Sequence, residues 1–124
     1  MLRKTGLLAL TLGVLAAPLH ASEHYVLLMG DGYFPDYVYP VVGDTIRFVN
    51  QSDVTMSATA SDESWDTGPM APGDVVILEV VDGMVQTFGD SVNGDNLAAG
   101  VIDYVNAAPL ELERNYERNH VEGN

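Results

Sequence analysis

Short runs of β-forming residues, separated by clusters of turn-forming residues, extend along most of this 124-residue chain. Between them we find no stretch with the apolar spacing of an amphipathic helix. The breaks, such as residues 30–32 and 71–74, are rich in glycine, proline and aspartate, which supply the backbone angles of tight turns. Regularly spaced short strands predict an all-β sandwich. The predicted strands are 25–29, 37–41, 45–50, 55–60, 75–81, 84–88 and 101–105.

The clearest alternation of apolar and polar residues lies in the predicted strand 45–50. Successive side chains of a strand point to opposite faces of its sheet. We therefore expect Ile46 and Phe48 to face the core and Arg47 to face outward.

The first 21 residues resemble a secretory signal peptide rather than part of the fold. Arg3 and Lys4 precede an apolar run over residues 6–17, and Pro18, Leu19 and His20 then lead to Ala21. Cleavage after Ala21 would make Ser22 the first mature residue. We therefore expect a signal peptide over 1–21, one domain over 22–106 and a polar tail over 107–124, in which 113–118 could form a short surface helix. The expected location is the periplasm or the extracellular space, without membrane insertion because no second apolar segment follows.

Composition excludes several classes of function. The chain has no cysteine, which rules out disulfides, cysteine nucleophiles, iron–sulfur clusters and thiolate-ligated metals. Five Lys and Arg residues stand against 18 Asp and Glu, for a net charge of −13. Phosphate backbones and anionic lipids would repel such a surface, so we expect no nucleic-acid partner. Because the acidic residues are spread along the chain, we interpret them as groups that keep the protein solvated in salt water. The alternative is a negative surface that attracts a basic partner.

Catalytic residues are scarce. Beyond residue 21 the only histidines are His24 and His120, which lie near the two ends of the expected mature chain. No nucleophile elbow, phosphate loop or metalloprotease motif is present. We therefore expect a protein that is not an enzyme.

Three segments, which occur in the order found in that family, resemble the cupredoxins, the small copper proteins related to plastocyanin, pseudoazurin and amicyanin. Residues 33–39 are similar to the Phe-x-Pro motif and the strand after it, and residues 42–50 are similar to the Gly-Asp-Thr turn and the strand ending in asparagine. Residues 64–73 are similar to the tryptophan loop and the Pro-Gly turn that follows it. The resemblance spans residues 23–105 and implies a cupredoxin-like Greek-key β-sandwich of about seven to eight strands.

The family binds copper through two histidines, a cysteine and usually a methionine, a ligand set with soft sulfur and constrained geometry. On this chain the resemblance places the first histidine at or beside Met56, the cysteine near Gly89 and the second histidine near Val92. The methionine falls near Leu97 or Ala98. Residues 87–100 contain no Cys, His or Met, so the type 1 copper site is missing and the family's electron-transfer activity does not carry over.

Two other metal hypotheses remain. A free amine at Ser22, the backbone nitrogens of Glu23 and His24 and the His24 imidazole form a square-planar set suited to Cu(II) or Ni(II). Met56 could add a soft thioether for Cu(I), although methionine more often fills gaps in a core. The oxygen-rich loop 90–96 could hold calcium, but it lacks the ligand spacing of an EF-hand and is better interpreted as a solvated turn.

The sequence therefore predicts a secreted cupredoxin-like protein that acts as a non-enzymatic binding or accessory module with an unknown protein partner and no resident cofactor. The alternative is a copper-handling protein that uses Ser22, Glu23 and His24, with or without Met56.

Overall fold

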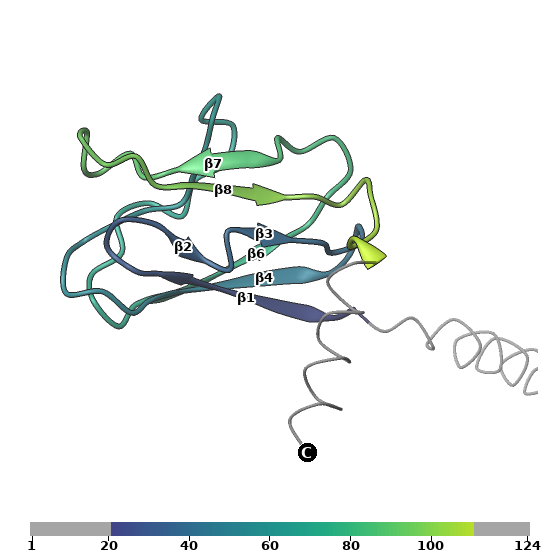
Figure 1. The fold of residues 1–124 in the computed structure, drawn as a ribbon, viewed down its shortest axis with the longest axis horizontal. Coiled ribbons are helices and arrows are strands. Elements are labelled where there is room, and N and C mark those ends of the chain that lie inside the picture. Colours follow the sequence, from purple (N-terminus) through teal and green to yellow (C-terminus); the bar gives the residue numbers. More distant parts are fainter. Residues whose placement is uncertain (1–20, 111–124) are drawn as a thin grey trace, which may run out of the picture.

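The computed structural model describes residues 21–110, which form two stacked four-stranded sheets without a membrane-spanning helix (Figure 1). Sheet A has the strand order β2-β1-β4-β6, and sheet B has the order β3-β8-β7-β5. The expected signal peptide up to residue 20 and the predicted helix over 113–118 lie outside the described residues. The strands are β1 (Glu23–Leu28), β2 (Tyr33–Phe34), β3 (Tyr37–Val38), β4 (Thr45–Asn50), β5 (Thr59–Ala60), β6 (Val75–Glu79), β7 (Thr87–Gly89) and β8 (Ala99–Ile102).

Two parallel pairings connect distant parts of the chain. β1 runs parallel to β4, and β3 runs parallel to β8, while the other neighbours in both sheets are antiparallel. The prediction of an all-β sandwich is confirmed. So is the alternation of β4, in which Ile46 and Phe48 are fully buried and Arg47 is only partly covered on the opposite face.

Several strands are shorter than the sequence indicated, and local chemistry explains two of them. The predicted strand 101–105 is wrong beyond Ile102, because the Asp103 carboxylate accepts hydrogen bonds from the backbone nitrogens of Val105 and Asn106 and folds the chain into a turn. The strand predicted over 37–41 ends at Val38, two residues before Pro40, which has no N–H to donate.

Three more strand boundaries were wrong. The strand predicted over 55–60 pairs only at Thr59–Ala60, with Met56 in an isolated bridge to Met70. The strand predicted over 75–81 ends at Glu79, and the strand predicted over 84–88 begins at Thr87. The structure has one strand more than the seven that were predicted. This strand is β2, whose two residues are too few to show alternation.

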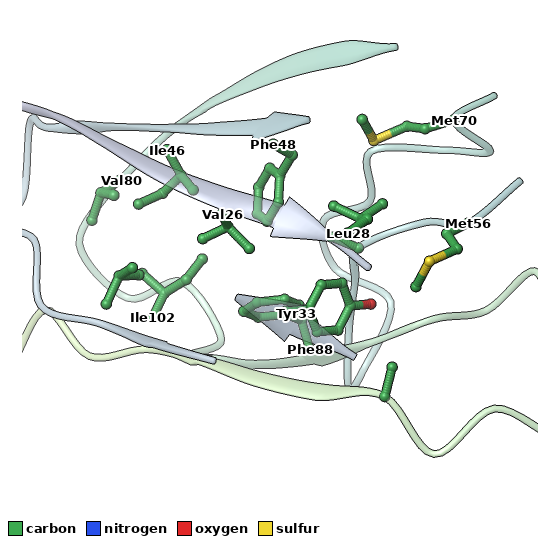
Figure 2. Close-up of a cluster of buried hydrophobic side chains, with 13 residues drawn as sticks. Val26, Leu28, Tyr33, Ile46, Phe48, Met56, Met70, Val80, Phe88 and Ile102 are labelled. Atoms are coloured by element: carbon green, nitrogen blue, oxygen red, sulfur yellow. The ribbon is translucent and has the colours of Figure 1, made fainter. Parts of the chain in front are cut away.

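An aromatic cluster fills the space between the sheets. The Phe88 ring lies 4.7 Å from the Tyr33 ring and 5.7 Å from the rings of Phe48 and Trp65, measured between centroids. Gly100 on β8 lies directly against Phe88, and a Cβ at that position would overlap the ring. Figure 2 shows the core extending from Val80 and Ile102 at one end to Met56 and Met70 at the other.

Candidate functional site

Several hydrogen bonds tie the loop that joins β7 to β8 to the rest of the protein. The most heavily bonded group in the loop is the carboxylate of Asp90. Its Oδ1 accepts hydrogen bonds from the backbone nitrogens of Ser57 at 3.1 Å and Val92 at 2.9 Å. Its Oδ2 accepts from the side-chain amides of Asn93 at 2.6 Å and Asn96 at 2.9 Å. Both oxygens of Asp90 are therefore occupied by donors from its own loop and from the segment before β5.

Buried hydroxyl groups extend this network toward β5. The Ser57 and Thr59 hydroxyls lie 2.9 Å apart, and each is also within hydrogen-bond distance of the Ser91 hydroxyl. The Thr59 hydroxyl is in addition 2.9 Å from Asp66 Oδ1, to which it donates. Ser57 and Thr59 are buried, so these contacts supply partners that water cannot.

Met56 lies beside this network, with no exposed surface. Its sulfur is 3.1 Å from the backbone nitrogen of Gly30, which donates to it, and its backbone pairs with that of Met70. The thioether therefore faces the interior and already has a donor.

The residues that the resemblance places at the copper-ligand positions differ in burial, from the fully buried Met56 to the exposed Leu97. Gly89 is the last residue of β7, where an added Cβ would be 3.0 Å from the Ala98 carbonyl oxygen. Val92 and Leu97 are exposed, and Ala98 is nearly buried. The polar side chains that lie together at this end belong to Asp90, Asn93 and Asn96. Asp90 directly follows Gly89 in the chain, and Asn93 directly follows Val92.

The sequence of residues 90–96 indicates a polar turn but does not distinguish Asp90 from the other polar residues of the loop. A weak signal was present, because aspartate and asparagine in loops commonly accept hydrogen bonds from backbone groups two residues later. Nothing local indicated that Ser57, 33 positions earlier, would be the other partner.

The oxygen-rich loop does not present an open ligand set. Within residues 21–110 no three His, Cys, Asp or Glu side chains are grouped so that they could hold a metal ion. Asp90 is saturated by four donors at 3.1 Å or less, and Asp95, the other carboxylate of the loop, is exposed to solvent. The calcium hypothesis therefore gains no support from this geometry.

The proposed metal-binding terminus lies elsewhere, at the start of β1. The Ser22 backbone nitrogen donates to Asp44 Oδ1, and His24 Nε2 is bonded to Asp44 Oδ2, each at 2.9 Å. The parallel pairing of β1 with β4 begins at Glu23, opposite Thr45, and includes His24. A square-planar metal set would need the backbone nitrogens of Glu23 and His24 as ligands. Metal binding there would therefore have to displace Asp44 and separate the first residues of β1 from β4.

Asp44 and Asp90 have lowered pKa values, and in both cases hydrogen bonds outweigh an opposing effect of burial. Burial alone would raise the pKa of Asp44, but the bonds from Ser22, Val41 and His24 hold it below its ordinary value. Burial would likewise raise the pKa of Asp90, but donors from Asn93, Val92, Asn96 and Ser57 lower it. Burial also raises the pKa of the Tyr33 hydroxyl, with the Asp90 charge as the second cause, so Tyr33 stays a neutral donor to the Ser57 carbonyl.

We expect acid to destabilise the protein partly through Asp90. A carboxyl whose pKa is lower in the folded than in the unfolded state stabilises the fold above the unfolded value, here 3.8, and that stability is lost as the pH falls through the folded value. Urea unfolding measured from pH ~5 down to pH ~2 should show this loss. Asp90→Asn should lose less stability over the same range, and parallel curves for the two proteins would contradict this assignment.

The strand order, the two parallel pairings and the aromatic core define a cupredoxin-like fold, as the resemblance implied. Neither a protein-family model nor a curated protein matches the chain. Among solved structures it resembles one titled "Novel Purple Cupredoxin from Nitrosopumilus maritimus", with a TM-score of 0.52 and 14% sequence identity. The match covers 64% of this chain and 99% of that one. At this identity the likeness shows the fold alone, and the positions expected for the copper ligands stay predictions.

Proposed function

We propose that this chain is an exported, non-enzymatic binding module on a cupredoxin-like scaffold that has no type 1 copper site. The observation that carries the proposal is the Asp90 carboxylate, which follows β7 on the loop where the resemblance places the copper thiolate. Its two oxygens are used to hold the loop closed, through four donors at 3.1 Å or less.

The chemistry of the surrounding groups supports the same conclusion. A type 1 site needs a thiolate and two imidazoles around the ion, with a thioether as a weak axial ligand. This end of the sandwich offers amides, hydroxyls and a hydrogen-bonded carboxylate, and the Met56 sulfur is turned inward. Hard, hydrogen-bonded oxygen does not replace soft sulfur for an ion that must change oxidation state.

The surroundings of the candidate catalytic groups within residues 21–110 support a role in binding. The one histidine of these residues, His24, is held by Asp44 at the start of β1 and lines neither of the two pockets described around Thr59 and Trp65. The hydroxyls of Ser57 and Thr59 are bonded to one another and to Ser91, and no imidazole lies among the partners of this network to activate them.

Copper titration tests the proposal. The exported protein, beginning at Ser22, is titrated with Cu(II) and with Cu(I) and followed by calorimetry and visible absorption. We expect no intense charge-transfer colour and no tight stoichiometric binding of either ion. His24→Ala and Met56→Leu are the matched variants, because each removes one candidate donor.

Two outcomes would contradict the proposal. Tight binding of one equivalent of Cu(II) that is lost in His24→Ala would establish the alternative, a copper-handling terminus made of Ser22, Glu23 and His24. Tight Cu(I) binding lost in Met56→Leu would show that the buried thioether can be reached.

A further inference from the structure

β6 is one of the two edge strands of sheet A, and its side opposite β4 has no neighbouring strand within the described residues. The bonds from Val80 N to Asp44 O and from Asn50 N to Asp74 O show that the even-numbered residues direct their backbone groups toward β4. In an antiparallel ladder the intervening residues direct theirs away. The N–H and C=O groups of Val75, Ile77 and Glu79 therefore point outward from the sheet.

This edge has little of the protection that natural proteins give to exposed strands. Residues 75–79 contain no proline and no lysine, which commonly block pairing with another chain. Val75 and Ile77 are 46% and 51% exposed, so two β-branched side chains stand beside the free backbone groups. The strand is thus a template to which an extended segment can add.

A pocket adjoins the same edge on the inward side of the strand. It has a volume of about 290 Å³ and includes Trp65, Leu78, Val81 and Met84 in its lining. The Trp65 indole N–H donates to the Val85 carbonyl at 2.8 Å, which fixes the ring. The volume is at the lower end for small-molecule sites, so it suits one large apolar side chain better than a whole ligand. Strand addition characteristically combines main-chain hydrogen bonds with such side-chain pockets.

The charge around the edge indicates what kind of segment fits. Asp74 precedes β6, Glu79 ends it, and Glu79 and Asp82 both line the pocket. Arg47, the one Lys or Arg residue among 21–110, is already paired with Glu23 at 3.2 Å. A second copy of this chain would bring another net charge of −13, whereas a basic segment would be attracted.

We propose that the β6 edge and the Trp65 pocket bind an extended basic segment of a partner protein as an added antiparallel strand, with one apolar side chain entering the pocket. This inference rests on the proposed binding function and assigns the chemistry of the partner. In antiparallel register, directly opposite residues share a face of the sheet. The partner residue opposite Leu78 therefore points into the pocket, and residues opposite Glu79 and Asp74 should be basic.

A capped synthetic peptide, Lys-Lys-Leu-Val-Val-Thr-Lys, has this pattern. Its second lysine lies opposite Glu79, its leucine opposite Leu78, its first valine opposite Ile77 and its last lysine opposite Asp74. Trp65 is the single tryptophan of the chain, and the peptide has none, so the emission of Trp65 reports filling of the pocket directly. We expect a saturable, one-to-one change in emission that weakens as salt is added.

Protein variants separate main-chain pairing from side-chain contact. Ile77→Pro removes an N–H that points to solvent and leaves the ladder with β4 intact, as proline on an edge strand does. It should weaken peptide binding by about tenfold, the effect of one or two lost hydrogen bonds. Ile77→Thr keeps the N–H at the same place and should bind within about threefold of the parent.

Peptide variants keep the test valid even if Ile77→Pro proves unstable. N-methylation of the valine opposite Ile77 blocks a pairing N–H and should weaken binding by about tenfold or more, whereas N-methylation of the valine opposite Val76 alters an N–H that faces away. Replacement of the leucine by alanine, or of the lysines by glutamate, should weaken binding by about tenfold or more.

Three results would overturn the inference. They are no saturable emission change with the parent peptide, equal binding of the two N-methylated peptides, and concentration-dependent self-association through β6 that Ile77→Pro abolishes. None of these results bears on the copper titration. The copper titration therefore tests the proposed function, and the peptide experiments test the β6 edge, so that one proposal can be contradicted without the other.

Discussion

Phe88→Ala should lower the free energy of unfolding by about 3–5 kcal/mol, the usual cost of removing a large buried aromatic ring. Phe88 is 3% exposed, and its ring contacts those of Tyr33, Phe48 and Trp65. Gly100 supplies no side chain that could move into the space left behind. Since domains of this size are stable by only about 5–15 kcal/mol, much of the total stability should be lost. Urea unfolding followed by Trp65 emission measures the loss.

Phe34→Ala is the matched control, because it makes the same chemical change on the surface. Phe34 ends β2 and is 66% exposed. It should change the free energy of unfolding by less than about 1 kcal/mol. If the two substitutions had equal effects, the aromatic cluster between the sheets would not be the core that the structure describes.

Asp90→Ala should lower the free energy of unfolding by about 2–3 kcal/mol and loosen the loop 90–98 against the segment before β5. The variant leaves donors on Ser57, Val92, Asn93 and Asn96 without the carboxylate that they share. Solvent can reach part of this site, which limits the cost. Amide hydrogen exchange at Ser57 and Val92, together with urea unfolding, measures both effects.

Asp95→Ala is the control for Asp90 in the same loop. Asp95 is exposed, and its substitution removes the same charge without removing a structural acceptor. We expect a change within about 0.5 kcal/mol and unchanged exchange at Ser57. An equal loss of stability in both variants would mean that total charge, rather than the geometry of Asp90, controls this loop.

Much of the fold could be predicted because β4, one of the two longest strands, has the most regular alternation of buried and partly buried residues. The alternation of β4 is visible in the residues themselves, and the turn at 42–44 is marked by glycine and aspartate. Strand ends were predicted less well, because they depend on side-chain hydrogen bonds in the adjoining turns and on pairing with strands that are distant in the sequence. The end of β8 is set by the turn around Asp103, and β2 exists only because Leu27 and Leu28 lie beside it.

The candidate site could be predicted only as a region. The resemblance located the loop after β7 and the segment around Met56, and the structure brings these two together. It did not identify Asp90 as the residue that joins them, because the Ser57 backbone amide becomes a partner only when β5 pairs with β7. The β6 edge was likewise not predicted, since a strand's position at the border of a sheet depends on strand order and not on its own residues.

The parallel pairing of β3 with β8 has a consequence for the order in which the protein can fold during synthesis. All four strands of sheet A have left the ribosome once Glu79 has emerged, so that sheet can begin to form on the nascent chain. Sheet B cannot be completed at that point, because β8 lies between β3 and β7 and is the last strand to be made. Tyr37 and Val38 can pair only after Val101 and Ile102 have been made. A chain released before Ala99 would contain all strands of sheet A but would lack β8, the strand of sheet B that joins β3 to β7.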